Sequence, residues 1–246
     1  MRLKAREFRP RTGPHTHRIV QPRHPLRHTT VNSPFHDRWG YLVGDHDGLS
    51  RLAALFSFAA FSRHTLVHVP LRTSLPRAFA PGTPVDLVLA HRATGGLRPS
   101  AWPALRARLQ GGRPLTLRTD EQRTADRAAV WNAAWERRDW ERRDWWEAGR
   151  IRPTVHARTL FLFGDRDSFC AAAGEFAAAA GYGPLEKRAR TGDDVLAASL
   201  TPYLEPSTWG VDRTELDIGF RARPPLHRFT PPGRPASRRS RTAASA

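Results

Sequence analysis

The sequence predicts an α/β sandwich of the α+β class, and three observations lead to this prediction. Apolar, β-branched runs typical of strands alternate with segments whose apolar residues follow the helical period. A unit of strand, tight turn and helix recurs at an offset of 120 residues. Hydrophobic residues make up 39% of the 246 positions, and 12 Phe and 8 Trp can fill a sizeable core. We therefore expect one globular core built from sheet and helices.

The internal repeat is the clearest pattern. Residues 39–60 match residues 159–180 at eight of 22 positions, and each copy contains a Gly-Asp-x-Asp turn between strand and helix. The apolar positions of both helices follow the spacing i, i+3, i+4, i+7, i+11, which is one face of a helix. A duplicated half explains this match, and so does independent convergence on the same local structure.

The segments around the two copies complete two halves, residues 29–119 and 150–222. The first half contains predicted strands at 39–44, 64–71, 85–91 and 115–118, with helices after the first strand and at about 100–109. This β-α-β-β-α-β order is the ferredoxin-like order. The second half contains predicted strands at 159–163, 185–190 and 213–220, and helices at 168–180 and 194–204.

A long Trp/Arg-rich helix at 120–149 connects the halves. It carries the tandem sequence Glu-Arg-Arg-Asp-Trp at 136–140 and 141–145. At about 100° per residue, four of its tryptophans share one stripe and Trp140 points away. The stripe can pack on the sheet, or the helix can bind single-stranded nucleic acid or a protein partner through Trp and Arg. The candidate partner or nucleic-acid residues are Arg137, Arg138, Trp140, Arg142 and Arg143.

Most of the net charge of +17 lies at the two ends of the chain. Residues 1–28 and residues 221–246 each carry +7, which leaves +3 for the rest. Both ends are rich in Pro and Arg and poor in apolar residues, so 1–28 and 223–246 are predicted to be disordered basic tails. Any nucleic-acid binding driven by these tails would be unspecific and would weaken steeply with salt.

Cysteine use and hydropathy indicate the compartment. The single cysteine, Cys170, excludes an intrachain disulfide and suits a reducing compartment. The first 28 residues lack the apolar region of a secretory signal, and the longest apolar run, 52–61, is shorter than the roughly 18 residues of a membrane span. We expect a soluble cytoplasmic protein without membrane contact, and a Cys170 that serves as a small buried hydrophobe.

The two Gly-Asp-x-Asp turns contain the candidate metal ligands. Their carboxylates follow a strand and precede a helix, so with a neighbouring histidine they could hold a divalent cation. The interpretation we favour is structural: Asp47 and Asp167 cap the helices, while Asp45 and Asp165 form the turns. The candidate metal set is Asp45, Asp47, Asp165, Asp167 and His46.

A second candidate site is the loop after the strand at 85–91. Its backbone N–H groups could cradle an anion with help from nearby arginines, although it lacks the Gly-Lys-Ser/Thr of a P-loop. A plain connecting loop is the simpler interpretation. The candidate anion-binding residues are His91, Arg92, Gly95, Gly96 and Arg98.

The sequence contains no Gly-x-Ser-x-Gly elbow, no His-Glu-x-x-His and no Cys/His zinc spacing. Because no nucleophile, base or complete ligand set emerges, we predict neither catalytic residues nor a cofactor. The expected function is that of a non-catalytic intracellular binding or regulatory protein. A nucleic-acid associated protein and a metal-dependent hydrolase at the Gly-Asp-x-Asp turns are the alternatives.

Overall fold

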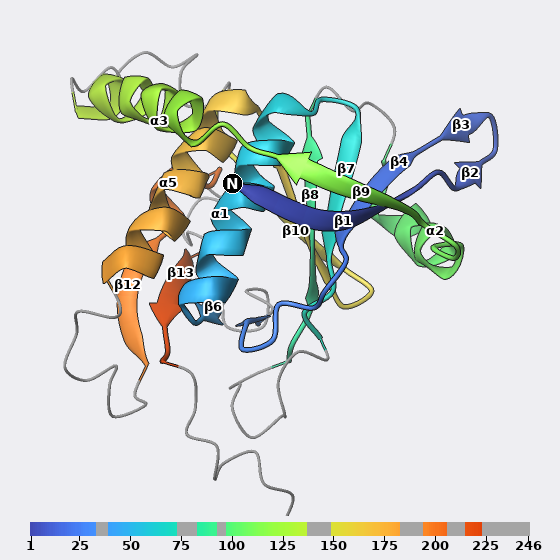
Figure 1. Cartoon of the computed structure of the whole chain (residues 1–246), viewed down its shortest axis with the longest axis horizontal. Helices are drawn as coiled ribbons and strands as arrows, with labels where there is room; N and C mark the ends of the chain where they lie inside the picture. Colours follow the sequence, from blue (N-terminus) through green and yellow to red (C-terminus); the bar gives the residue numbers. More distant parts are fainter. Residues whose placement is uncertain are drawn as a thin grey trace, which may run out of the picture.

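Two mixed β-sheets and a pair of long helices form the centre of the molecule (Figure 1). The computed structural model describes residues 1–32, 39–72, 83–92, 97–136, 149–182, 194–205 and 215–222. The larger sheet has seven strands in the order β10 (Arg152–His156), β11 (Thr159–Gly164), β8 (Asp86–His91), β7 (Thr65–Val69), β4 (Arg18–Pro22), β1 (Arg2–Phe8) and β9 (Arg113–Arg118). The smaller sheet has four, in the order β12 (Val195–Ser199), β13 (Glu215–Phe220), β6 (Trp39–Gly44) and β5 (Thr30–Val31). A separate hairpin joins β2 (Arg11–Thr12) and β3 (His15–Thr16).

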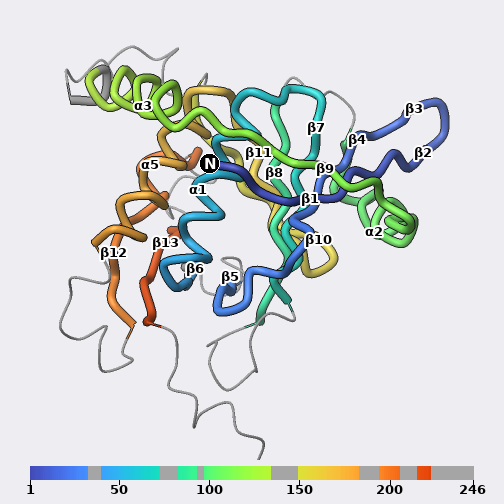
Figure 2. The backbone as a smooth tube through the Cα atoms, in the orientation of Figure 1, coloured from blue at the N-terminus to red at the C-terminus, as the bar shows by residue number. Residues whose placement is uncertain are grey.

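The long helices are α1 (His46–Phe61) and α5 (Arg166–Tyr182), which lie side by side (Figure 2). Phe56 of α1 packs on two rings of α5, with centroid distances of 5.8 Å to Phe169 and 4.8 Å to Phe176. Helix α1 contacts β7 and β8 of the larger sheet, and α5 contacts β12 and β13 of the smaller one. The main core therefore joins both sheets through this helix pair.

Two other helices cover this centre. Helix α3 (Glu121–Glu136) crosses α5, and its Trp131 lies in the main core, 6.2 Å from the ring of Tyr203. Helix α2 (Trp102–Ala107), which follows the short helix η2 (Pro99–Ala101), lies on the other face of the larger sheet. Trp102 and Leu105 of α2 are fully buried there in a second, smaller core.

The mixed α+β class is confirmed, and most elements of the repeat lie where the sequence predicts them. The predicted strand at 159–163 is β11, and the predicted helix at 168–180 belongs to α5. The predicted helix at 194–204 is wrong, because the segment forms β12 and the short helix η5 (Thr201–Tyr203). Pro202 explains the difference, since a proline inside an α-helix removes a hydrogen bond and clashes with the preceding turn. The predicted strand at 185–190 lies outside the described residues.

The strands of the first half do not form one ferredoxin-like sheet. Strand β6 belongs to the smaller sheet, whereas β7, β8 and β9 belong to the larger one. Each sheet instead combines strands of both halves: β11 pairs in parallel with β8, and β6 pairs in parallel with β13.

The two parallel pairings correspond residue by residue. In one, Thr159 to Gly164 face Asp86 to His91; in the other, Trp39 to Gly44 face Glu215 to Phe220. Each ladder ends in the same way, because the N–H of Arg92 donates to Gly164 and that of Arg221 donates to Gly44. Strands β6 and β11, which the offset of 120 residues relates in sequence, therefore also pair with their neighbours in the same register. Neither half of the chain forms a complete sheet alone.

The prediction that residues 1–28 are a disordered tail is wrong. Strand β1 pairs with β4 and β9, and β4 pairs with β7, so the segment forms strands inside the larger sheet. Leu3 and Ala5 are buried while Arg2 and Lys4 are exposed. The positive charges lie on the solvent side of a strand whose other side packs on the core, so they do not oppose folding. The predicted boundary of the core at residue 29 is therefore also wrong, and the predicted tail 223–246 lies outside the described residues.

A charge placed on the buried side of β1 tests this assignment. We expect Ala5→Asp to lower the free energy of unfolding by about 3 kcal/mol or more, because Ala5 has no exposed surface and an unpaired carboxylate would be buried. Arg6→Asp puts the same group on the exposed side and should change the stability by less than about 0.5 kcal/mol. Urea unfolding of both variants gives the two values. Equal, small effects would mean that β1 does not pack on the core.

Candidate ligand-binding cavity

The Gly-Asp-x-Asp turns are helix caps, but the capping residues are not the ones that the sequence suggested. Oδ1 of Asp45 accepts the backbone N–H of Gly48 at 2.8 Å, and Oδ1 of Asp165 accepts that of Ser168 at 2.9 Å. Asp165 also accepts the hydroxyl of Ser168 at 2.8 Å. The first aspartate of each turn is therefore the N-cap, because it is the residue directly before the helix.

The second aspartates lie in the first helical turns. Asp47 is 3.4 Å from Arg51, and Asp167 is 3.9 Å from Arg127 of α3. Both carboxylates still complement the helix dipole, but neither caps its helix. The prediction that Asp47 and Asp167 are the caps is wrong by two residues, because Asp45 and Asp165 cap the helices.

The two turns lie at opposite ends of the helix pair. Nδ1 of His46, at the start of α1, is 3.0 Å from the carbonyl oxygen of Ala180, near the end of α5. The helices are therefore antiparallel, and a helix of 16 residues is about 24 Å long. The candidate metal residues Asp45, Asp47, Asp165, Asp167 and His46 cannot converge on one ion. Among the described residues, no group of three or more His, Cys, Asp or Glu side chains is arranged to hold a metal.

The candidate anion loop is only partly described, because Gly95 and Gly96 lie outside the described residues. His91 is buried at the end of β8, and Arg98 is exposed. The guanidinium of Arg92 donates to the carboxylate of Glu205 and to the carbonyl of Arg150, so this arginine already has protein acceptors. The candidate partner or nucleic-acid residues Arg137, Arg138, Trp140, Arg142 and Arg143 all lie outside the described residues.

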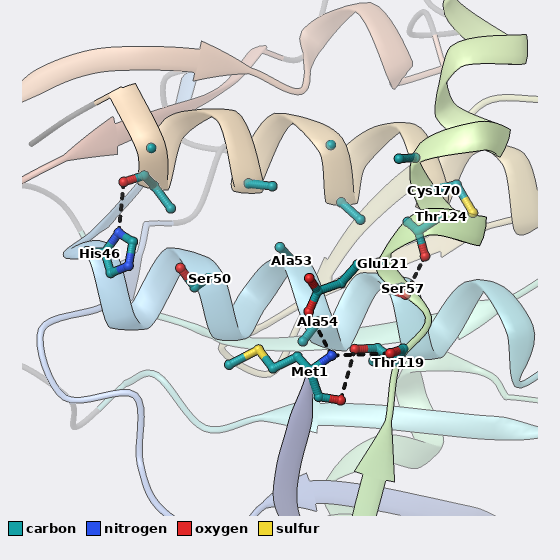
Figure 3. A pocket seen from close by; sticks show the side chains of 16 residues that line it. Met1, His46, Ser50, Ala53, Ala54, Ser57, Thr119, Glu121, Thr124 and Cys170 are labelled. Atoms are coloured by element: carbon teal, nitrogen blue, oxygen red, sulfur yellow. Dashed lines mark hydrogen bonds and ion pairs between the residues drawn. The ribbon is translucent and has the colours of Figure 1, made fainter. Parts of the chain in front are cut away.

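A cavity of about 430 Å³ lies between α1, α5 and the start of α3 (Figure 3). Small side chains from both long helices line it: Ala53 and Ala54 from α1, and Ala173 and Ala177 from α5. Gly174 lies between the last two and is exposed. Because alanine and glycine project little beyond the backbone, the antiparallel helices leave an open apolar space along their shared outer face.

Polar groups lie at the two ends of this cavity. His46 and Ser50 of α1 lie at one end, as Figure 3 shows. Thr124 of α3 lies at the other end and makes a 2.6 Å hydrogen bond with the hydroxyl of Ser57. Glu121, at the first turn of α3, lines the cavity between these ends. The space thus combines an apolar wall with a few fixed polar groups, which is typical of a ligand-binding pocket.

Cys170 lines the cavity but is poorly suited to nucleophilic chemistry. The side chain is fully buried, and this burial, with the nearby Asp167 carboxylate, raises the pKa of Cys170 to about 11. The thiol is therefore protonated near neutral pH, whereas the reactive form of cysteine is the thiolate. Cys170 is therefore not an activated nucleophile.

The most buried polar cluster lies elsewhere, between the larger sheet and α2. The Asp86 carboxylate accepts the backbone N–H groups of Leu71 and Arg72 at 3.1 and 3.2 Å, and it pairs with the Arg72 guanidinium at 2.8 Å. Burial opposes ionisation of Asp86, but its contacts with His68 and Arg72 outweigh that effect and hold its pKa below the usual value. Burial lowers the pKa of His68. This cluster fixes the chain after β7, because Asp86 holds the backbone of Leu71 and Arg72.

Comparisons with known proteins found no matching family model, no matching curated protein and no matching solved structure. Within the part of the chain that the structure describes, no helix is both long and apolar enough to cross a membrane.

Sequence reasoning missed the cavity, although a signal for it exists. The outer face of α5 carries Ala173, Gly174, Ala177 and Gly181, a run of small residues at helical spacing. Such a run predicts close approach of another element as readily as an open groove. Only the position of α3 distinguishes these outcomes, and the sequence does not specify where a connecting helix crosses its neighbours.

The cap assignment generates a stability prediction. Asp45→Ala and Asp165→Ala should each lower the free energy of unfolding by about 0.5–2 kcal/mol, because each leaves a helix N–H without its acceptor. Asp47→Ala, which removes an exposed ion pair and a carboxylate that complements the helix dipole but no cap, should cost less than Asp45→Ala. Asn at position 45 or 165 should restore most of the loss, since its side-chain oxygen caps as well as that of Asp. Thermal melts measure all of these changes, and a larger loss from Asp47→Ala than from Asp45→Ala would contradict the assignment.

Proposed function

We propose that this protein is a non-catalytic binding protein, and that the cavity between α1, α5 and α3 receives a small apolar ligand. The single observation that carries this proposal is the cavity itself, with its volume of about 430 Å³ and its wall of alanine and glycine. This volume falls within the range of about 300–1,000 Å³ that is usual for small-molecule sites.

The lining indicates the kind of ligand. An apolar body would contact Ala53 and Ala177, which line the cavity from the two long helices. Polar groups of the lining, such as Ser50 at one end and Glu121 between the ends, would orient a hydrogen-bonding substituent. A ligand with an apolar body and one polar end fits this distribution, because burial of apolar area supplies affinity and fixed polar groups supply orientation.

Two further parts of the proposal concern location and origin. The single cysteine is present as a free, buried thiol, which supports a cytoplasmic protein. The matched registers of the β8/β11 and β6/β13 pairs support duplication of one ancestral unit rather than convergence. In this account the two copies of the unit exchanged strands, as two protomers do in a domain-swapped dimer, and both copies now lie in one chain.

Titration with N-phenyl-1-naphthylamine, a neutral probe that fluoresces in apolar surroundings, tests the cavity. We expect saturable binding to the full chain, and we expect Ala177→Phe to weaken it by about tenfold or more, because a phenyl ring fills the space between the helices. Ala178→Phe is the matched control. Ala178 is also exposed on α5 but does not line the cavity, so its replacement should change the affinity by less than about twofold.

Circular dichroism and thermal melts of both variants check that the fold is retained. Absence of saturable binding by the unmodified chain would contradict the proposal. Equal weakening by Ala177→Phe and Ala178→Phe would also contradict it, because the probe would then bind outside the cavity.

A further inference from the structure

The cavity between α1, α5 and α3 is a long groove (Figure 3). Its lining runs along α1 from His46 to Ser57 and along α5 from Cys170 to Gly181. Each helix therefore contributes about three turns, which span about 16 Å at a rise of about 1.5 Å per residue. A volume of about 430 Å³ over this length corresponds to a mean width of about 5 Å. The groove is thus much longer than it is wide.

These dimensions match a single carbon chain. Non-bonded carbon atoms pack at about 3.5–4.0 Å, so one unbranched chain is about 4 Å thick. Bonds of about 1.5 Å at near-tetrahedral angles advance an extended chain by about 1.25 Å per atom, so about 12 carbons fill the length. Alanine and glycine line the middle of the groove and offer no polar side-chain group to such a chain.

The deep end of the groove suits the methyl end of the chain. Ser57, Thr124 and Cys170 line this end, and each is buried. The Thr124 hydroxyl donates to the carbonyl oxygen of Asp120 at 2.8 Å, so the 2.6 Å bond between Ser57 and Thr124 uses the hydroxyl hydrogen of Ser57. Both hydroxyl donors are thus satisfied within the protein. An apolar group can lie against them without leaving a buried donor unpaired.

The opposite end can hold a hydroxyl group. His46 is exposed and lies there with Ser50, about one turn further along α1. Nδ1 of His46 is 3.0 Å from the carbonyl oxygen of Ala180 and donates its hydrogen, since a carbonyl only accepts. In the neutral ring Nε2 is then an acceptor, while the Ser50 hydroxyl can donate and accept. A ligand hydroxyl, which also donates and accepts, complements this pair.

The carboxylates near the groove do not favour a charged ligand. Asp45 accepts the N–H of Gly48 as the cap of α1, and Asp47 is 3.4 Å from Arg51. Glu121 borders the groove between its ends, but its side chain is 75% exposed, so its carboxylate remains hydrated. These groups do not require a cationic ligand, and their negative charges disfavour an anionic one.

We propose that the groove binds an unbranched aliphatic alcohol of about 12 carbons, with its hydroxyl between His46 and Ser50 and its methyl end beside Ser57. This inference rests on the proposed function and narrows it, because it specifies the class and the orientation of the ligand.

Isothermal titration of the full chain with 1-hexanol and 1-decanol tests the inference without a fluorescent probe. Each methylene group that enters the groove should raise the affinity by about fourfold. We therefore expect 1-decanol to bind about a hundredfold or more tighter than 1-hexanol. Ser50→Ala should weaken the binding of 1-decanol by about threefold or more, because it removes a hydrogen-bonding partner of the ligand hydroxyl.

Gly174→Leu tests the orientation, because it shortens the groove from its deep end. Residue 174 is about 6 Å along α5 from Cys170, and a Cβ added there would meet Ala128 at 3.8 Å, an ordinary contact. We expect this variant to weaken 1-decanol by about tenfold or more and 1-hexanol by less than about twofold, since only the longer chain extends past residue 174. Ala178→Leu is the matched control on the exposed surface of α5 and should leave both affinities unchanged.

The outcomes separate this inference from the proposed function. Equal losses for both alcohols in Gly174→Leu would overturn the orientation, and tighter binding of decanoate or decylamine than of 1-decanol would overturn the uncharged end group. Saturable binding of N-phenyl-1-naphthylamine without binding of 1-decanol would overturn the inference and leave the proposed function intact. Absence of binding by both would contradict the inference and the proposed function together.

Discussion

The rest of the structure depends on the two parallel strand pairings that join the halves of the chain, β8 with β11 and β6 with β13. Parallel neighbours need long connections, and the two helices α1 and α5 carry the chain from one sheet to the other between these pairings. Helix α1 leaves the smaller sheet and returns the chain to the larger one, while α5 does the reverse. The exchange places both helices between strands of the two halves, where Phe56 meets Phe169 and Phe176. The helix pair, both sheets and the main core therefore form together.

The proposed cavity follows from this arrangement. The antiparallel helices present a face of small side chains, and α3 crosses one end of that face, so an open apolar cavity remains between them. The same antiparallel packing carries the end of α1 to the start of α5, where arginines from separate elements gather around Phe61. The antiparallel packing of the helices thus creates the apolar space along them.

Local patterns predicted the fold better than global charge did. The repeat located β6, α1, β11 and α5, because strand, glycine turn and apolar helix spacing are all local signals. The high positive charge of residues 1–28 favoured disorder, yet the period of two in Arg2, Leu3, Lys4, Ala5 and Arg6 is that of a strand with one charged side. The net charge of the segment therefore favoured disorder, whereas the alternation of its charged and apolar residues is typical of a strand.

The candidate sites were harder to predict because they depend on which elements become neighbours. The capping positions were misassigned by two residues, since a Gly-Asp-x-Asp turn offers two aspartates and only the exact helix start distinguishes them. The ferredoxin-like prediction rests on the order of the elements along the chain. That order does not show which sheet each strand joins. His91 and Asp165, which belong to separate sequence motifs, lie close together only because β8 and β11 are paired.

Native-state hydrogen exchange tests the central claim, that the exchanged strands form one cooperative unit, most directly. If β8, β11, β6 and β13 depend on one another, their slowest amide protons should share one free energy of opening, equal to that of global unfolding. Denaturant should lower all four values with the same slope. If the amides of β6 and β13 instead opened several kcal/mol below those of β8 and β11, the two sheets would unfold separately and the account would be contradicted.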